Sequence, residues 1–194
     1  MNDIIKPGAG ILFMKVGTHA QEPLEEIIAR KRREIDDAGF ALWGYGGSTC
    51  HPQTMVQPFA RSYAKKGGSI YLCMEEMESH HFAEQVRAEQ SSSDGLTWKD
   101  IPLSVNVLGS RYALVIKALR REALELPLSR TRVAVGNSQG RAGDLYVSGR
   151  VDKACLEIVE TDASTPGTER NVAISLVAEL EPPYAVFLRN RPRL

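Results

Sequence analysis

The residues best suited to chemistry in this sequence lie close together at positions 43–52, which read WGYGGSTCHP. Glycines let a backbone approach a ligand closely, and long loops without regular structure are uncommon in compact domains unless they have a function. The rings of Trp43 and Tyr45 offer a face for a planar ligand, and His51 offers a polar contact. The alternative is that both aromatic residues belong to the core. The predicted ligand-binding residues are Trp43, Tyr45, Gly46, Gly47, His51, His80 and Arg111.

Cys50 stands next to His51, which suggests a thiol nucleophile with a histidine base. Neighbouring side chains in an extended segment point to opposite faces, and Pro52 favours an extended backbone at His51. We therefore expect that these two side chains do not pair and that any base comes from elsewhere. Histidine is the side chain that titrates near neutral pH. The catalytic candidates are His51, His80 and Cys50, and the alternative for Cys50 is a structural thiol.

All four histidines lie between residues 19 and 81. His19, His51 and His80 each follow a different predicted strand. If those strands are parallel and adjacent, their carboxyl ends meet at one edge of the sheet, where open α/β sheets usually bind ligands. A zinc site is one version of this arrangement, but the tight spacings that metal sites usually have, such as CxxC, are absent. The candidate metal ligands are His19, His51, His80 and Glu84, and the leading expectation is a site without metal.

A second polar cluster lies at residues 91–98, SSSDGLTW, with Arg111 shortly after it. Hydroxyl and backbone amide groups can surround an anion, and Trp98 can cover a ring. The alternative is a turn at Asp94 and Gly95 with Trp98 in the core. The phosphate-loop motif GxxxxGK[ST] is absent, and GYGG is too short for a dinucleotide fingerprint. The cofactor, if there is one, is therefore unknown.

Hydrophobic patterns predict the elements that position these residues. Strands are predicted at 10–16, 40–43 and 69–74, and a long loop at 44–57. Helices are predicted over 23–38, from Pro58 onwards, and after Ser79 as N-cap. Residues 10–90 therefore alternate β-α-β-α-β-α.

The charged run at residues 30–33, RKRR, lies on the first of these helices. Acidic residues lie one helical turn after these basic residues, for example Glu34 after Arg30, and can pair with them. Such pairs of opposite charge are typical of a solvated helix face. We therefore expect a solvent-exposed outer face rather than a nucleic-acid surface.

Strand patterns dominate the rest of the chain and predict a mainly antiparallel sheet or small barrel over about 100–190. The class is therefore α+β. The change near residues 90–100 is compatible with one domain or with two closely packed lobes. The predicted strands are 104–108, 112–119, 132–135, 145–147, 154–159, 172–180 and 185–188.

The composition of this 194-residue chain limits its function class. It is 43% hydrophobic with a formal net charge of zero, so no overall field attracts it to nucleic acid or acidic lipid. We find no signal peptide and no membrane span, and predict a soluble, cytoplasmic protein. Its three cysteines form no CxxC pair, which predicts thiols rather than disulfides.

The sequence favours a pocket, formed by loops of the first half, for a small polar ligand such as a phosphorylated or nucleotide-like molecule. Whether the protein is also an enzyme is left open. One alternative is a module for RNA or single-stranded nucleic acid, because 11 of the 13 basic residues after position 100 are arginine. Another is a protein-interaction domain or homo-oligomer without a small ligand.

Overall fold

The computed structural model describes residues 4–45, 50–81, 83–148, 151–160 and 170–192. The chain forms two compact units, each assembled from three separate segments. Unit 1 consists of Met1–Lys15, Pro58–Glu76 and Arg120–Glu179, and unit 2 of Val16–Gln57, Met77–Leu119 and Leu180–Leu194. The chain passes between the units at 15–16, 57–58, 76–77, 119–120 and 179–180, rather than near residues 90–100.

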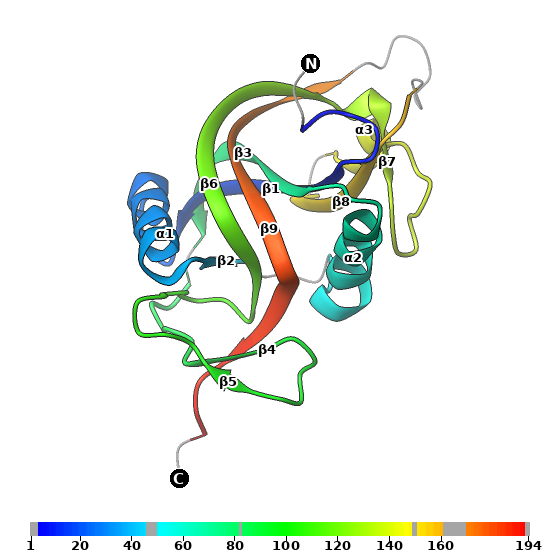
Figure 1. Ribbon diagram of the computed structural model, residues 1–194. Coiled ribbons are helices and arrows are strands. Elements are labelled where there is room, and N and C mark those ends of the chain that lie inside the picture. Colours follow the sequence, from blue (N-terminus) through cyan, green and yellow to red (C-terminus); the bar gives the residue numbers. More distant parts are fainter. Residues whose placement is uncertain (1–3, 46–49, 82, 149–150, 161–169, 193–194) are drawn as a thin grey trace. The chain divides into compact units, whose positions relative to one another are not determined.

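Helices and strands follow one another as shown in Figure 1. They are β1 (Gly10–His19), α1 (Leu24–Ala38), β2 (Ala41–Gly44), η1 (Pro52–Val56), α2 (Gln57–Lys65), β3 (Ile70–His81), β4 (Gln90–Ser92), β5 (Lys99–Asp100), β6 (Tyr112–Pro127), η2 (Leu128–Arg130), β7 (Thr131–Val133), α3 (Gly143–Tyr146), β8 (Lys153–Ile158) and β9 (Asn171–Arg189). The strands pair in the order β2-β6-β9-β3-β1-β8-β7, with β4 joining β9 and β5 joining β4. This sheet is mostly antiparallel and is not closed, which confirms the predicted α+β class and favours the sheet over the barrel.

Unit 1 has its own apolar core. In it, β8 pairs antiparallel with both β1 and β7, and β3 pairs antiparallel with β9. The buried cluster between these strands includes Phe13, Cys73, Leu156 and Val177. β8 is buried on both faces, since Lys153 and the apolar residues Ala154, Cys155 and Leu156 are four consecutive buried residues.

Unit 2 has a second apolar core. In this unit β2 pairs antiparallel with β6, and β4 pairs with the last residues of β9 and with β5 (Figure 1). The core cluster includes Leu42, Val107, Val115 and Leu188. Residues from three distant parts of the sequence therefore pack together.

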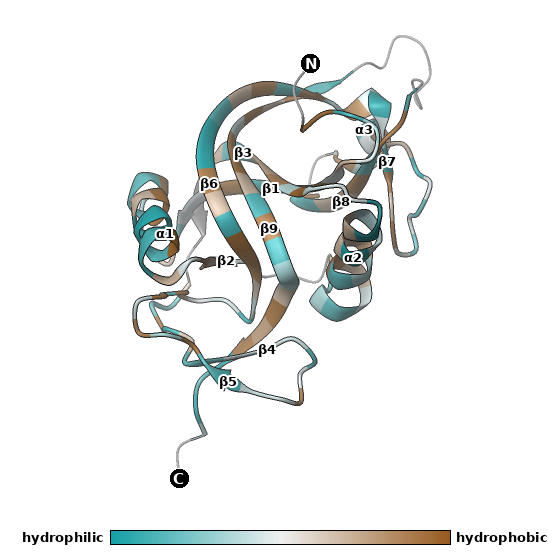
Figure 2. Ribbon diagram, viewed as in Figure 1, coloured by the Kyte–Doolittle hydropathy of each residue, from teal (hydrophilic) through white to brown (hydrophobic). Residues whose placement is uncertain are grey.

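Helix α1 begins one residue after its predicted start and ends at the predicted residue, Ala38. Pro23 takes the N-cap position in an extended conformation, and Gly39 ends the helix with a left-handed φ of 82° and an N–H that donates to the Ile35 carbonyl. Ile27 and Ile28 are buried on the inner side. Much of the helix is hydrophilic in Figure 2 because of its charged residues.

Four predicted elements differ from their form in the structure. Residues 104–108, expected as a strand, form no strand, and Leu108 makes only an isolated bridge with Arg87. The expected helix after Ser79 is absent, because β3 continues to His81. Residues 145–147 were expected as a strand, but residues 145 and 146 form the end of the short helix α3. The two strands expected at 172–180 and 185–188 are one continuous strand, β9. A short helix gains little from a single cap, whereas strand pairing satisfies the backbone along a whole element, so pairing decides the lengths of β3 and β9.

All three cysteines are buried and remain thiols, as predicted. Burial raises the pKa of Cys73 to about 12, so its thiol stays protonated at neutral pH. No helix within the described residues is long and apolar enough to cross a lipid bilayer.

Candidate functional site

A groove of about 550 Å³ opens in unit 2 where three chain segments lie side by side. The Gly109 N–H donates to the Val86 carbonyl at 3.0 Å, and the Leu188 N–H donates to the Arg111 carbonyl at 2.8 Å. The segments that these bonds join come from before β4, before β6 and from the end of β9. The groove is lined by Glu84, Val86, Ala88, Gly109, Ser110, Arg111, Leu188, Arg189 and Asn190.

Arg189 has a defined orientation in this groove. Its guanidinium carbon lies 4.0 Å from the ring centroid of Trp98, and its Nε donates to Gln90 Oε1 at 3.0 Å. One contact fixes the plane of the guanidinium, and the other fixes its direction within that plane. Among the described residues, its two terminal nitrogens have no hydrogen bond or ion pair, so two parallel N–H donors stay available for a carboxylate or phosphate.

Arg111 supplies a second guanidinium to the same groove. Its side chain is exposed, and within the described part of the chain it has no ion pair. The backbone bond from Leu188 places Arg111 beside the residue that precedes Arg189. Glu84 is the acidic member of the lining. The groove therefore combines two guanidinium groups with one carboxylate and the polar side chains of Ser110 and Asn190.

The floor of the groove requires a glycine at position 109. Gly109 has φ of +58°, and a Cβ there would lie 2.9 Å from both the Ala83 Cβ and the Glu84 carbonyl oxygen. Such contacts are closer than van der Waals packing allows, so a side chain would displace residues 83 and 84. The same position faces His19, whose Nε2 would lie 3.4 Å away.

His19 lies behind the groove rather than in it. Its Nε2 is 3.1 Å from the Leu108 carbonyl oxygen and acts as the donor, because a carbonyl only accepts. His19 therefore fixes the backbone just before Gly109, and this nitrogen is not available to a metal.

His51 packs in a cluster of three rings. It lies edge-on to Tyr112 at 5.8 Å and to Phe187 at 5.6 Å between ring centroids, and those two rings are 5.5 Å apart. Its Nδ1 accepts from the Thr54 N–H at 3.4 Å, a long hydrogen bond that caps η1. Tyr112 follows Arg111 in sequence, so His51 lies near the groove segments without being among the described lining residues.

The other residues predicted in the loop at 44–52 do not form an open site within the described chain. Trp43 and Tyr45 are 4% and 1% exposed, so their rings belong to the interior of unit 2, and their stacking role stays a prediction. Cys50 is buried. Gly46, Gly47 and the side chain of His80 lie outside the described residues. Gly44 contacts the groove from behind, since a Cβ on it would lie 2.5 Å from Ser110 Oγ.

The predicted meeting of three strand ends is wrong. β1 and β3 are neighbours in the sheet, but β2 pairs with β6 and is separated from β3 by β6 and β9. β2 pairs with neither β1 nor β3 because the long strands β6 and β9 lie between them. Among the described residues, no group of three or more His, Cys, Asp or Glu side chains could hold a metal ion. Of the predicted residues, Arg111 and Glu84 do share one groove.

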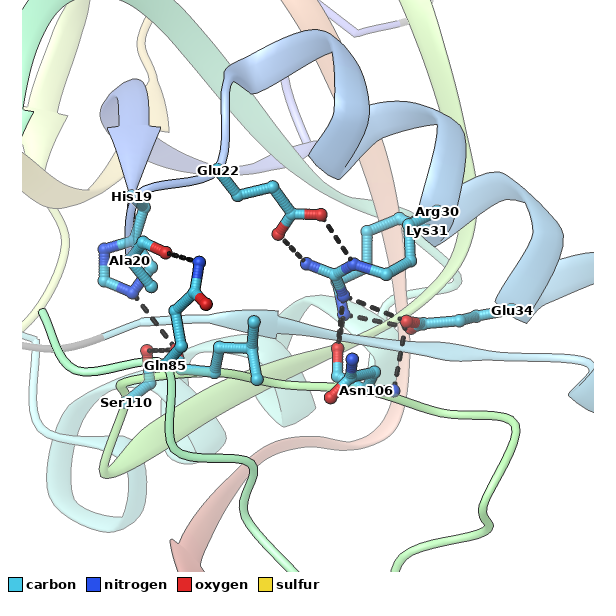
Figure 3. Close-up of polar contacts among 10 residues, drawn as sticks. His19, Ala20, Glu22, Arg30, Lys31, Glu34, Gln85, Asn106 and Ser110 are labelled. Atoms are coloured by element: carbon cyan, nitrogen blue, oxygen red, sulfur yellow. Dashed lines mark hydrogen bonds and ion pairs between the residues drawn. The ribbon is translucent and has the colours of Figure 1, made fainter.

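A set of buried and half-buried charges on α1 and just before it was not expected from the sequence (Figure 3). We call it the charge network, and it consists of Glu22, Arg30, Lys31 and Glu34. Arg30 donates to Glu22 and pairs with Glu34 at 3.1 Å, and Lys31 Nζ pairs with Glu34 at 2.9 Å. Lys31 and Glu34 are each 2% exposed, so the expected solvated face is wrong at these positions.

Burial lowers the pKa of Lys31 to about 8, against the attraction of Glu34, which raises it. One signal in the sequence marks the network. Lys31 continues the apolar stripe of Ile27 and Ile28 at helical spacing, so a lysine stands where a core residue is expected.

Comparison with family models, with curated proteins and with solved structures finds no match to this chain.

Proposed function

We propose that unit 2 binds a small polar ligand through an anionic group, a carboxylate or a phosphate, in the groove. The observation that supports this most directly is the orientation of Arg189 by Trp98 and Gln90, with both terminal nitrogens available. A guanidinium fixed in this way loses less entropy when it binds an anion, and its planar fork matches two oxygens at once.

Two further features of the lining favour a ligand that carries more than a charge. Arg111 adds a second cation, which suits a divalent group such as a phosphate monoester. Glu84 adds a carboxylate that can accept from a hydroxyl or amino group beside the anion. Nucleotide-like and other phosphorylated molecules are the phosphate case of this proposal, and small hydroxy or amino acids are the carboxylate case.

The proposal concerns binding. Cys50 and His51 are absent from the described groove lining, so their catalytic roles, like that of His80, stay predictions. The same holds for the nucleic-acid and homo-oligomer alternatives.

Calorimetric titration with inorganic phosphate, pyrophosphate and malonate tests the proposal. We expect saturable binding of at least one of them, weakened roughly 10- to 100-fold in Arg189→Ala, because a hydrogen bond to a charged group contributes about 1.5–3 kcal/mol. Arg189→Lys should weaken binding as well, since lysine keeps the charge but not the fork. Arg111→Ala should weaken pyrophosphate more than malonate, because the second guanidinium adds most to the more highly charged probe.

The matched control is Arg132→Ala, which removes an exposed arginine of β7 in unit 1. It should leave all three affinities unchanged. The proposal is wrong if none of the three probes binds in the millimolar range, or if the double variant Arg111→Ala/Arg189→Ala binds as tightly as the wild type. A preference for phosphate probes or for malonate then identifies which of the two ligand chemistries the groove takes.

A further inference from the structure

The backbone of Asn106 is bound on both sides by charges of α1. Its N–H donates to Glu34 Oε1 at 3.0 Å, and its carbonyl oxygen accepts from Arg30 Nη1 and from Lys31 Nζ, each at 2.5 Å. These contacts are drawn in Figure 3. Three side chains of one helix thus converge on the backbone of a single residue in a distant loop, and all of these residues belong to unit 2.

The charge network is balanced but costly to bury. Two carboxylates face two cations, with Arg30 between Glu22 and Glu34. Burying such groups costs desolvation free energy that their attraction barely recovers, and apolar residues of similar size often give equal stability. Stability therefore does not account for lysine and glutamate at the buried positions 31 and 34. What apolar side chains cannot do is bind a backbone N–H and carbonyl and so fix a loop.

The loop that these charges fix leads directly into the groove. We call residues 106–111 the groove wall. After Asn106, the Val107 carbonyl accepts from the Ala88 N–H at 3.0 Å, His19 donates to the Leu108 carbonyl at 3.1 Å, and the Gly109 N–H donates to Val86. Gly109, Ser110 and Arg111 then line the groove. The wall is thus fixed at its first residue by α1 and presents its last residue, a cation, to the ligand.

We propose that the charge network positions the groove wall and, resting on the proposed function, that α1 thereby sets the affinity of the groove for its anionic ligand. The four residues of the charge network are positioning residues and are absent from the described groove lining. Arg30, Lys31 and Glu34 act through the backbone N–H and carbonyl of Asn106, and Glu22 acts through Arg30. Loss of Glu34 frees the Asn106 N–H, and loss of Lys31 removes one of the two donors to the Asn106 carbonyl. Arg111 then samples positions in which it no longer faces Arg189 across the bound anion.

Hydrogen exchange of individual amides tests the first half of this proposal without any ligand. In Lys31→Met, whose side chain is similar in size but has no charge, we expect exchange at the Gly109 and Ala88 amides to rise about tenfold or more. The Ala134 amide, bonded to the Cys155 carbonyl in unit 1, should not change. Glu22→Gln is a milder change at the half-buried end of the network, and it should also raise exchange at the Gly109 and Ala88 amides. If Lys31→Met fails to fold, the exchange rates in Glu22→Gln decide whether the network positions the wall.

Two control variants on α1 separate positioning from general loss of stability. Arg33→Met removes an exposed charge outside the network and should have no effect. Ile28→Ala removes buried apolar contacts of the same helix but leaves the network intact, so it should lower global stability without selectively raising exchange at Gly109. If Ile28→Ala and Lys31→Met raise Gly109 exchange equally relative to Ala134, the positioning role is wrong.

The effect of α1 on the affinity of the groove is tested by titrating the same variants with malonate and pyrophosphate. We expect Lys31→Met to weaken binding about 5- to 20-fold and Ile28→Ala and Arg33→Met to leave it unchanged. Faster exchange at Gly109 with unaltered affinity would overturn the coupling between α1 and the ligand. A wild type that binds none of the probes would overturn the proposed function, and the exchange data would still decide whether the network positions the wall.

Discussion

At the scale of single residues, Lys31 makes the stability of the fold depend on pH. Its pKa is about 8 in the folded protein, mainly because of burial, against an ordinary value of 10.5. Arg30, Glu34 and Glu22 are the charged groups that act on it, and the Asn106 carbonyl accepts from it. Between these two pKa values the unfolded chain binds more protons than the folded one, so the free energy of unfolding rises with pH.

The stabilising contribution of neutral Lys31 is therefore complete above about pH 10.5 and is lost as the pH falls through about 8. We expect the unfolding free energy of the wild type, relative to Lys31→Met, to rise by roughly 2–3 kcal/mol across this window, since one pKa unit corresponds to about 1.4 kcal/mol. Urea unfolding of both proteins at several pH values measures it. The opposite effect of the buried Cys73 thiol, whose pKa is raised, cancels in the difference. A difference that does not change with pH would contradict the prediction.

At the scale of elements, the groove depends on a tight approach between the segment at residues 83–86 and the groove wall. Gly109→Ala would place a Cβ against the backbone of Glu84 at a left-handed φ, so we expect a loss of about 1–3 kcal/mol in unfolding free energy and weaker anion binding. Gly140→Ala is the control, because Gly140 also has a positive φ but open space around it. It should cost only the backbone strain, about 1 kcal/mol, and leave binding unchanged. Thermal unfolding and calorimetry measure the two effects, and equal binding losses in both variants would contradict this account of the groove.

How far the sequence predicts these elements depends on how local their causes are. Helix α1 could be predicted to within one residue because its apolar stripe and the flanking Pro23 and Gly39 are local features of the sequence. The end of β3 could not, because Ser79 is a good local helix cap and only pairing with distant strands overrides it. Arg111 and Glu84 were candidates from the sequence, but Arg189 was not. Its orientation depends on the pairing of β9 with β4, whose partner sequences are about 100 residues apart.

At the scale of the whole molecule, both units are built from segments that are distant in sequence. Hydrophobic patterns show that a strand exists but do not show which strand it pairs with, and with seven strands in the main order many arrangements fit the same pattern. The expected meeting of the loops that carry His19, His51 and His80 assumed that the three strands before them are parallel and adjacent. β1 and β3 are neighbours but β2 is not, so the three strand ends do not meet as expected, although the α+β class is confirmed.

The charge of the whole chain leads to a last prediction, which separates the groove from a nucleic-acid surface. The 24 basic and 24 acidic residues balance, and arginines of the second half are partly neutralised within their own units, as Arg121 is by Glu76 and Arg191 by Asp100. A balanced surface releases few counterions on binding a polyanion. We therefore expect a fluorescently labelled single-stranded RNA to bind no tighter than about 100 μM at roughly 0.15 M salt.

Fluorescence anisotropy over a range of salt concentrations measures this, with the double variant Arg111→Ala/Arg189→Ala as the comparison. Binding in the micromolar range whose logarithm falls steeply with the logarithm of salt concentration would contradict the prediction and favour the nucleic-acid alternative. If that binding also disappeared in the double variant, the two guanidinium groups would be phosphate contacts along a strand. If the double variant bound RNA as weakly as the wild type but had lost malonate or pyrophosphate, the two arginines would serve a small anion alone.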